Sequence, residues 1–584
     1  MDHQALIAKA REYIALEQDD FFRAQVVSLL EENNVAELND RFFTDLAFGT
    51  GGLRGVIGGG YNRMNSYTVK RATQGLANYI KKHASIRPSA VIAYDSRHFS
   101  DVFSLKAALV LCANGIRTWL FSSLRPTPEL SFAVRRFKAT AGIVVTASHN
   151  PPEYNGYKVY WSDGGQVTPP HDTGIIDEVR AVKGMVAEMP EHEAIGKGLL
   201  KLIDSEIDDP FIAMIKAQSL RPDLVKTHGC KLTVVYTPLH GSGAMPVQRA
   251  LGELGITVAF VPQQEKPDGD FPTVKYPNPE DGSAMQLALE LGRTKKADLV
   301  MGTDPDADRI GIAAPEGGDF RLITGNELGA LLLDYILSSR KELGTLPENG
   351  VFIKTIVTSE LQRLIAESYD IKTIDVLTGF KYIGEKIREF ETTPGRPVFL
   401  FGGEESYGYL TGPEVRDKDA VSSAVMAAEM TVYHQSRGKT LIDRLKELWL
   451  RYGYFKETGI SGTFKGQQGL ETMAKLMEML RNNPPAAFAG RNVISLKDYR
   501  TGTTRLFAEQ SSRKDIELPS SNVLQFFLAD GSIVTARPSG TEPKIKFYVS
   551  CRSAAGTALD VAMREVQGAN DSIGAELRTL IDKA

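Results

Sequence analysis

Four short segments carry residue types that act on phosphate groups or sugars. The most acidic is GTDPDADRIG, residues 302–311, in which Asp304, Asp306 and Asp308 are spaced by two. Three carboxylates this close repel one another unless a cation lies among them, and their hard oxygens favour Mg²⁺ or Ca²⁺. An EF-hand is excluded because Arg309 stands at the sixth position, where glycine is needed. The same residues would also suit a solvated acidic turn.

A second segment, TASHNPPEYNGYK at 146–158, places Ser148 on a polar turn directly after an apolar run. Ser, Asn and Pro all favour turns for local reasons, so a plain turn former is one interpretation of this serine. A G-x-S-x-G nucleophile elbow is excluded, because Thr146 and Asn150 stand where its glycines would be. The residues alone leave both a chemical and a structural role open for Ser148.

Two further segments suit sugar and phosphate binding. GGEESYG, 402–408, has glycines that allow close approach of a ligand, while Glu404 and Ser406 can bond sugar hydroxyls. RPSGTEPK, 537–544, combines an arginine with hydroxyl groups and a glycine, which suits a phosphate cradle. Each segment alone is a weak signal. The phosphate-binding candidates in the second are Arg537, Ser539, Gly540 and Thr541.

The elements that must position these loops follow one pattern three times. An apolar strand is followed by a stretch with helical spacing, and then by a second apolar strand that runs into a polar or Gly-rich loop. Such alternation is typical of layered α/β domains, and binding loops in open α/β sheets lie where strands end. The opening strands are expected in 90–97, 231–241 and 351–359, and the closing strands in 142–151, 297–309 and 397–408.

The two ends of the chain differ from this pattern. Residues 1–40 have helical spacing and many charges, which predicts an N-terminal helical extension. Beyond about residue 455, apolar segments at 522–530 and 544–550 bracket the fourth loop and a helical tail follows, which indicates a smaller α+β domain. Polar or Gly/Pro-bearing stretches predict linkers at 162–175, 205–210 and 455–468.

Composition excludes several classes of protein. The 584 residues suggest roughly four domains, and the net charge of −4 argues against a basic nucleic-acid-binding surface. No apolar run approaches the length of about 18 residues that suggests a membrane span. Three widely separated cysteines exclude a disulfide scaffold and fit a reducing compartment. The N-terminus lacks the order of a signal peptide, so the sequence predicts a cytoplasmic protein.

Considered together, the four loops resemble those of the α-D-phosphohexomutase superfamily, the phosphoglucomutase/phosphomannomutase enzymes. The order is the same, with one loop per domain, and the resemblance covers the chain from about residue 48. It extends to GTGGLRG (49–55), TGNE (324–327) and TGFKYIGE (378–385). The chain length and EESYGYLTG are similar to those of the bacterial glucose-type mutases.

The resemblance implies a fold. We expect three related α/β domains with mixed sheets, and a C-terminal α+β domain similar to the TATA-binding protein, arranged around a central cleft. The helical extension is expected at 1–40. The four domains are expected at 41–205, which contains the serine loop, 206–320, which contains the metal loop, 321–455, which contains the sugar loop, and 456–584, which contains the phosphate loop.

The resemblance also implies a mechanism, in which Ser148 carries a phosphoryl group and Mg²⁺ is held by that phosphoserine with Asp304, Asp306 and Asp308. The phosphoryl group passes to the far hydroxyl of a sugar 1-phosphate, and the bisphosphate turns round before Ser148 takes back the other phosphate. Further catalytic candidates are Arg54, His149, Lys158, Arg309 and Lys418. Substrate-binding candidates are Thr50, Glu404, Ser406, Arg537, Ser539, Gly540 and Thr541. The acid/base stays open, because His149 can instead hold the loop and both lysines can contact phosphate.

The leading expectation is a phosphoglucomutase-type isomerase, with glucose 1,6-bisphosphate as intermediate and activator. Its partners would be small sugar phosphates, with no nucleic acid or membrane, and it would be a monomer or homodimer. Related alternatives are a phosphomannomutase, a phosphopentomutase or a glucose-1,6-bisphosphate synthase. From other classes, a metal-dependent sugar phosphatase would use Asp304 as nucleophile, in a loop similar to that of haloacid-dehalogenase-type phosphatases. A catalytically silent sugar-phosphate-binding protein would have no need for Ser148.

Overall fold

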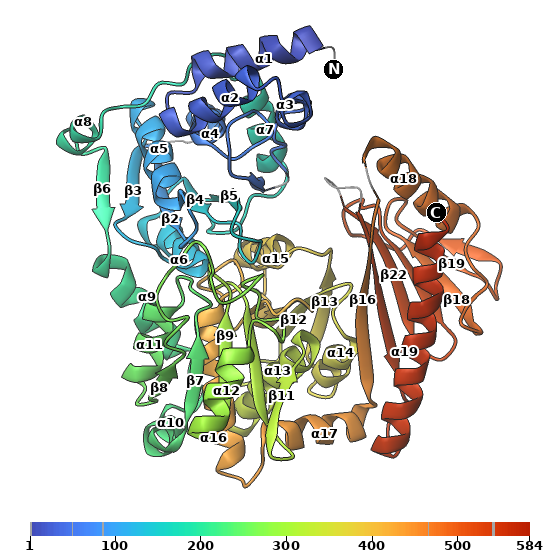
Figure 1. Cartoon of the computed structure of the whole chain (residues 1–584). Helices are drawn as coiled ribbons and strands as arrows, with labels where there is room; N and C mark the ends of the chain where they lie inside the picture. Colours follow the sequence, from blue (N-terminus) through green and yellow to red (C-terminus); the bar gives the residue numbers. More distant parts are fainter. Residues whose placement is uncertain (1–2, 50, 84–86, 465, 540–543) are drawn as a thin grey trace. The chain divides into compact units, whose positions relative to one another are not determined.

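The computed structural model describes residues 3–49, 51–83, 87–464, 466–539 and 544–584 (Figure 1). These residues form two compact units. The first unit comprises the chain up to Gly325 together with Phe380–Gly438, and the second comprises Asn326–Gly379 and Lys439–Ala584. Among the described residues, no helix combines the length and apolar character needed to span a bilayer.

The first unit begins with a small helical cluster. Tyr13 lies at its centre, edge-on to Phe42 and Tyr61. Asp19 and Asn34 cap the second and third helices by accepting hydrogen bonds from backbone N–H groups. The helices are α1 (His3–Leu16), α2 (Asp20–Glu31) and α3 (Val35–Phe42). The helical character predicted for the N-terminal extension is therefore confirmed for the described residues.

A mixed sheet follows, with strands in the order β1-β5-β4-β2-β3-β6. The inner strands are parallel, and β5 and β1 are antiparallel additions at one edge. Its strands are β1 (Gly52–Val56), β2 (Ser89–Tyr94), β3 (Arg117–Phe121), β4 (Ala141–Val145), β5 (Tyr154–Trp161) and β6 (Leu200–Ile203).

Helices cover both faces of this sheet, which explains why its inner strands β2 and β4 are mostly apolar and buried (Figure 1). Ala90 and Ile92 of β2 belong to one buried cluster, while the alternate residues Val91 and Ala93 belong to another. One face is covered by α4 (Ser66–His83), α5 (Ser100–Ala113) and α7 (His171–Ala181), and the other by α6 (Thr127–Phe137) and α9 (Ser205–Ala217). The short helix α8 (Glu191–Gly196) precedes β6.

A second mixed sheet in the same unit has the order β11-β10-β9-β7-β8. Again β7, β8 and β9 are parallel, and β10 and β11 return antiparallel. Its strands are β7 (Val234–Thr237), β8 (Val258–Phe260), β9 (Leu299–Thr303), β10 (Ile310–Glu316) and β11 (Asp319–Ile323). The accompanying helices are α10 (Pro222–His228), the 3-10 turn η1 (Gly229–Lys231), α11 (Ala244–Glu253) and α12 (Gln286–Lys295).

The last part of the first unit contains an antiparallel strand pair, β14 (Val398–Gly403) and β15 (Tyr409–Leu410). The helices α15 (Lys381–Thr392) and α16 (Ala420–Gln435) flank the pair. Residues 420–434 of α16 are buried one after another, so this helix lies inside the unit rather than on its surface.

The second unit combines a parallel strand pair with a large antiparallel sheet. Its first elements are α13 (Gly325–Glu342), β12 (Gly350–Thr355), α14 (Glu360–Glu367), β13 (Lys372–Val376) and α17 (Leu441–Tyr452), of which β12 and β13 are parallel. The antiparallel sheet has the order β16-β23-β22-β21-β18-β19-β20, and β17 pairs with β18. The helices α18 and α19 pack on its strands, so the predicted α+β class is confirmed. These elements are β16 (Phe455–Thr463), α18 (Gly466–Asn482), β17 (Ala487–Phe488), β18 (Arg491–Asp498), β19 (Thr503–Leu506), β20 (Ser511–Arg513), β21 (Leu524–Leu528), β22 (Ile533–Pro538), β23 (Lys544–Arg552) and α19 (Leu559–Asp582).

Two predicted linkers are wrong. Residues 205–210 form the first turns of α9, because acidic residues suit a helix N-terminus as well as a linker. Much of 455–468 is β16, which lies at the edge of its sheet and alternates between buried and exposed residues, so it appears polar in sequence. The four domain boundaries stay predictions, as does the central cleft.

Candidate active site

Strand β4 delivers Ser148 onto a loop that the protein holds tightly. Ser148 is only 3% exposed, and its backbone has a left-handed φ of 50°. Its N–H donates to Thr146 Oγ1 (2.8 Å), and that hydroxyl donates in turn to Asp95 Oδ2 (2.5 Å). A non-glycine residue in this conformation is strained, and such residues persist where their surroundings fix them.

Arg97 fixes the rest of this loop. Its guanidinium lies 3.5 Å from Asp95, and both side chains are fully buried. One cation therefore organises the carbonyl groups of this loop and of the first residue of β5. Its carbonyl partners belong to Ser148 (2.6 Å), Pro151 (2.8 Å), Tyr154 (3.1 Å) and Asn150.

The acidic loop closes the hairpin between β9 and β10, in which Thr303 pairs with Ile310. Asp304 Oδ1 accepts the N–H groups of Asp308 (3.1 Å) and Arg309 (3.0 Å), so this carboxylate organises its own loop. All three aspartates are buried. Their carboxylates are thus held in place by the loop backbone and not dispersed in solvent.

The two loops meet at the serine hydroxyl. Ser148 Oγ donates to Asp304 Oδ2 at 2.6 Å, although the residues lie 156 positions apart in sequence. The same oxygen lies 3.2 Å from Nδ1 of His149. The sequence-predicted serine, histidine and first aspartate therefore lie together.

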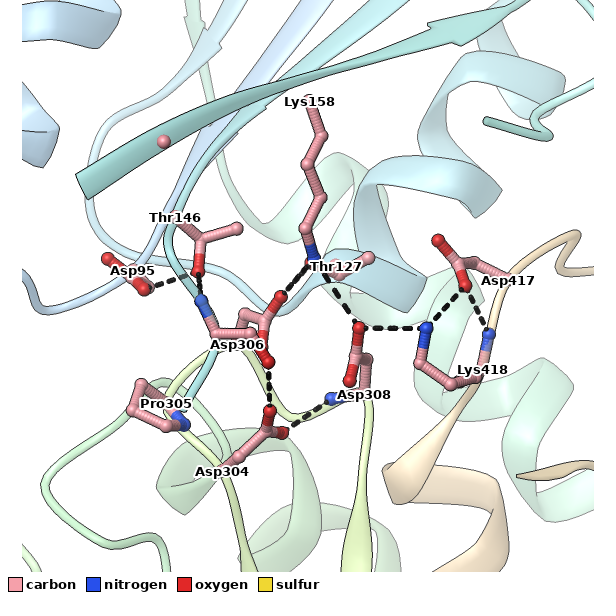
Figure 2. A network of polar contacts seen from close by, with 12 residues as sticks. Asp95, Thr127, Thr146, Lys158, Asp304, Pro305, Asp306, Asp308, Asp417 and Lys418 are labelled. Atoms are coloured by element: carbon pink, nitrogen blue, oxygen red, sulfur yellow. Dashed lines mark hydrogen bonds and ion pairs between the residues drawn. The ribbon is translucent and has the colours of Figure 1, made fainter. Parts of the chain in front are cut away.

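Two lysines neutralise the acidic loop from different elements (Figure 2). Lys158 of β5 approaches Asp306 Oδ2 (2.7 Å) and Asp308 Oδ2 (3.4 Å). Lys418, which precedes α16, lies 3.1 Å from the same Asp308 oxygen and 3.1 Å from Asp417. The structure brings both predicted lysines to the cluster.

The remaining carboxylate oxygens fit a divalent cation. Among the described residues, Oδ1 of Asp306 and Oδ1 of Asp308 are buried and have no hydrogen-bond partner. One oxygen from each of Asp304, Asp306 and Asp308 can be chosen so that all three lie within 4.8 Å of one another. Buried polar atoms are rarely left unpaired, so these two oxygens are suited to bind a cation. Carboxylate oxygens are ligands that Mg²⁺ accepts.

The electrostatics reflect this crowding. Burial and the neighbouring carboxylates Asp306 and Asp308 raise the pKa of Asp304 well above its ordinary value. Burial opposes ionisation of Asp306, but Lys158 outweighs it and lowers the pKa of that carboxyl. Burial likewise opposes charge on Lys418, but Asp308 and Asp417 outweigh it and raise its pKa. Burial, with Arg309 and Arg54 nearby, lowers the pKa of His149 well below its ordinary value.

The predicted sugar loop, residues 402–408, begins in the last two residues of β14, and its residues 404–408 connect β14 to β15 and adjoin the acidic loop. The N–H of Ile310 donates to the carbonyl of Tyr407 (3.0 Å). Glu404 is buried, and Ser406 is half-buried. A Cβ on Gly408 would lie 2.1 Å from Cδ of Lys418, so glycine lets the lysine side chain lie directly against this loop.

The two predicted arginines of the first unit differ in their surroundings. Arg309 donates to Glu280 Oε1 (2.6 Å), which anchors it beside the acidic loop. Arg54 is exposed and donates to the side chain of Asn150 (3.2 Å) in the serine loop. Arg309 therefore adjoins the acidic loop and Arg54 the serine loop, and their catalytic roles stay predictions.

The phosphate loop belongs to the second unit. Arg537 lies near the end of β22, paired with Lys546 of β23, and is half-buried. The N–H of Ser539 donates to the carbonyl of Lys544 (2.7 Å). The other predicted members, Gly540 and Thr541, lie outside the described residues, as does Thr50.

Sequence reasoning missed several residues that support these groups. Thr127 contacts Asp306, and Tyr160 OH donates to Asp417 (2.7 Å). Asp95 and Arg97 were visible only as the end of the apolar segment 90–97, where Asp-Ser-Arg after a strand was a usable signal. Thr127 and Glu280 offered none, because their partners are distant in sequence.

Comparison with known proteins gives matches over most of the chain. Four models of one family match in order: phosphoglucomutase/phosphomannomutase alpha/beta/alpha domain I at residues 45–184, domain II at 209–317, domain III at 324–452 and the C-terminal domain at 486–567. A phosphoglucomutase of Staphylococcus haemolyticus is 38% identical over 530 residues, which cover 90% of this chain and 94% of that protein. One from Staphylococcus aureus strain MSSA476 is 37% identical, covering 90% and 93%.

Solved structures share the fold at lower identity. The phosphoglucomutase pp63/parafusin of Paramecium aligns with a TM-score of 0.68 and 18% identity, covering 91% of this chain and 96% of that one. A phosphoglucomutase/phosphomannomutase family protein of Burkholderia thailandensis aligns with a TM-score of 0.62 and 18% identity over the same shares. The predicted fold class is confirmed by the family matches and these alignments.

Proposed function

The chain belongs to the phosphoglucomutase/phosphomannomutase family, and from that premise we propose that it interconverts α-D-glucose 1-phosphate and glucose 6-phosphate. The reaction would run through a phosphoserine at Ser148 and a glucose 1,6-bisphosphate intermediate, which also serves as activator. Support for glucose comes from relatives named phosphoglucomutase at 36–38% identity over most of the chain.

The observation that carries this proposal is the contact of Ser148 Oγ with Asp304 inside a buried cluster of carboxylates and lysines. Phosphoryl transfer asks a protein chiefly to position groups and to neutralise charge. Ser148, Asp304, Asp306 and Asp308 would hold Mg²⁺, which when bound supplies positive charge to the transferring phosphoryl group. A plain binding protein would gain nothing from a serine at this place.

In the first half-reaction the bond between Ser148 Oγ and phosphorus breaks, and a bond from the far sugar hydroxyl to phosphorus forms. The hydroxyl proton passes to a base. After the bisphosphate reorients, Ser148 Oγ forms a bond to the phosphorus of the other phosphate. The bond from that phosphorus to the sugar oxygen breaks, and the protonated base returns a proton to that oxygen. In their charged forms Lys158 and Lys418 would offset negative charge, and Arg309 would do the same. We keep His149, Lys158, Lys418 and Arg54 as acid/base or electrostatic candidates.

Substrate binding is proposed for two loops. Glu404 with Ser406 would hold the 3- and 4-hydroxyls, which a sugar can present in either orientation. Contacts with the 3- and 4-hydroxyls discriminate poorly between sugars that differ at carbon 2, as glucose and mannose do. Mannose 1-phosphate should therefore be a substrate with a lower rate. The non-reacting phosphate would bind the segment that contains Arg537, Ser539, Gly540 and Thr541, with Thr50 as a further contact.

A coupled assay tests the proposal. The purified protein is assayed with Mg²⁺ and a trace of glucose 1,6-bisphosphate on the 1-phosphates of glucose, mannose and ribose. We expect kcat/KM to be highest for glucose and lowest for ribose, since a pentose lacks the sixth carbon and shortens the span between its phosphates. Ribose 1-phosphate ranking first would indicate a phosphopentomutase, and mannose 1-phosphate a phosphomannomutase.

Other products identify the remaining alternatives. Release of inorganic phosphate would indicate a phosphatase, and net accumulation of glucose 1,6-bisphosphate would indicate a synthase. Binding without turnover would indicate a silent sugar-phosphate-binding protein. A cytoplasmic location and a monomeric or homodimeric state stay predictions, and light scattering would measure the latter.

A further inference from the structure

Thr127 holds Asp306 at two points. It is the first residue of α6 and is fully buried. Its N–H donates to the backbone carbonyl of Asp306 (2.9 Å), and its Oγ1 donates to Asp306 Oδ2 (2.9 Å). One residue of the first sheet's helices therefore fixes both the chain and the side chain of an aspartate that lies 179 positions away.

The two carboxylate oxygens of Asp306 have different surroundings (Figure 2). Oδ2 accepts hydrogen bonds from both Thr127 and Lys158 Nζ (2.7 Å). Oδ1 is buried and has no hydrogen-bond partner among the described residues. Lys158 alone would fix the carboxylate less well, because its ammonium also lies 3.4 Å from Asp308.

Thr127 is itself well anchored. Two residues earlier, the N–H of Arg125 donates to the carbonyl of Tyr94 (3.0 Å). The guanidinium of Arg125 forms two hydrogen bonds with Asp208, of 2.8 and 2.9 Å. Bidentate pairs of this kind add geometric specificity. Pro126 and Pro128 flank Thr127 and restrict its backbone further.

We propose that Thr127 is a positioning residue for the metal site: its hydroxyl occupies Asp306 Oδ2 and thereby commits Oδ1 to the divalent cation. This inference rests on the proposed function, since it takes the acidic loop as the Mg²⁺ site. Residues that orient metal ligands in this way typically change metal affinity about 10- to 100-fold when they are mutated.

The test measures metal binding directly, on the whole protein and without substrate. Mn²⁺ affinity is measured by electron paramagnetic resonance and Mg²⁺ affinity by calorimetry, at equal Ser148 phosphorylation as judged by intact mass. Thr127→Val and Thr127→Ala remove the hydroxyl but keep the N–H, and should weaken both affinities about 10- to 100-fold. Thr127→Ser keeps the hydroxyl and should bind close to the wild type.

Ser131→Ala is the matched control. Ser131 lies one turn further along α6, is also buried, and donates to the carbonyl of Gly164 (2.6 Å). Its loss should leave metal affinity unchanged. In the Thr127→Val protein, raising Mg²⁺ to saturation should restore most of the lost kcat.

The outcomes separate the two proposals. Wild-type affinity in Thr127→Val and Thr127→Ala would overturn the role of Thr127 and leave the proposed function intact. Equal weakening in Thr127→Ser or in Ser131→Ala would overturn it too, because α6 packing would then be the cause. Absence of metal binding by the wild-type protein would overturn the metal site itself. Thermal unfolding identifies any variant that fails to fold, and the two hydroxyl-free variants serve as replacements for each other.

Discussion

The serine and acidic loops of the first unit differ sharply from the end of β22 in the second. Around Ser148 the N–H, the carbonyl and the hydroxyl are each engaged by another residue, and the side chain is buried. Arg537 is half-buried at a strand end and is located chiefly by pairing with Lys546. Groups that take part in bond making need tight positioning, which fits the role proposed for Ser148. Arg537, proposed to bind the non-reacting phosphate, would contribute charge-assisted hydrogen bonds.

Backbone conformation underlines the same difference. Ser148, Ala307 and Tyr407 all have left-handed φ angles, of 50°, 48° and 63°, and each belongs to one of the three adjoining loops of the first unit. Each such residue costs of order 1–3 kcal/mol and persists only where its surroundings fix it. The first unit thus maintains a strained geometry before any ligand binds.

The comparison predicts the largest loss for Ser148→Ala. Removing the phosphate carrier should lower kcat by at least about 10⁴-fold, since loss of a nucleophile removes the covalent step. Intact mass should show a phosphoryl group on the wild-type protein and none on the variant. Ser406→Ala is the matched control and should cost far less. Full activity without Ser148 would show that the first unit does not perform the transfer.

Asp306→Asn tests the acidic loop. It removes a negative ligand and one of the two unpaired oxygens, so metal affinity should fall at least about 100-fold, more than for typical residues that only orient a ligand. Calorimetry with Mg²⁺ measures the change. Asp177→Asn replaces an exposed aspartate and should have no effect. Unchanged activity in excess chelator would contradict the metal site.

Arg537→Ala tests the other region. A charge-assisted hydrogen bond is worth roughly 1.5–3 kcal/mol, which corresponds to about 10- to 150-fold in kcat/KM. Ser148 should keep its phosphoryl group. Arg537→Lys retains charge and should recover part of the loss, and Arg491→Ala, in the same sheet, should be neutral. Loss of the phosphoserine with normal substrate binding would reverse the roles that we assign to the two regions.

Gly408→Ala tests how closely the sugar loop and Lys418 must approach. A Cβ there would lie 2.1 Å from Lys418 Cδ, so the lysine must move. Because the side chain is flexible, we expect a loss of about 10-fold in kcat, below the roughly 100-fold expected when a catalytic geometry shifts by 1 Å. Gly403→Ala, with its nearest contact at 3.2 Å, is the control. Equal losses of kcat in both variants would show that the close contact between Gly408 and Lys418 is not the cause of the loss.

The smallest effect concerns two aspartates at helix N-termini. Burial raises the pKa of Asp419, which caps α16 in the first unit, to about 6. Its contribution to stability is therefore present below about pH 4 and is lost as pH rises through about 6. Asp443 of α17 in the second unit is exposed, and hydrogen bonds from Thr440 lower its pKa. The pH dependence of its contribution to stability is therefore opposite: the contribution is present at neutral pH and is lost on acidification.

Denaturant unfolding at pH 4 and pH 8 separates these two carboxyls. Asn retains capping ability, so Asp419→Asn should raise the free energy of unfolding at pH 8, by at most about 3 kcal/mol for a shift of about two pKa units. Asp443→Asn should lower it slightly at pH 8 and leave it unchanged at low pH. A fall at pH 8 for Asp419→Asn would contradict the raised pKa.

Local sequence was sufficient for much of this molecule. Alternating strands and helical segments predicted three layered α/β domains and the loops that end β4, β9 and β14, and the family resemblance predicted that the sheets are mixed. The spacing of Asp304, Asp306 and Asp308 after a strand indicated a cation site through charge repulsion, with a solvated acidic turn as the alternative. The family resemblance favoured the metal site and implied the role of Ser148. Linkers at 205–210 and 455–468 were wrong because polarity does not distinguish a linker from a helix N-terminus or an edge strand.

Residue types and local periodicity by themselves therefore indicated layered α/β domains and four candidate loops, and the resemblance of those loops to known enzymes indicated the family, which the family matches confirm. Only the tertiary structure decided which oxygens of Asp306 and Asp308 are engaged by other residues and which have no hydrogen-bond partner among the described residues. That choice depends on Thr127, Lys158 and Lys418, whose distances from the acidic loop along the chain leave no local pattern. A hydrogen bond between groups more than 100 residues apart is specified by the packing of whole elements, and a sequence window records only one of its two partners.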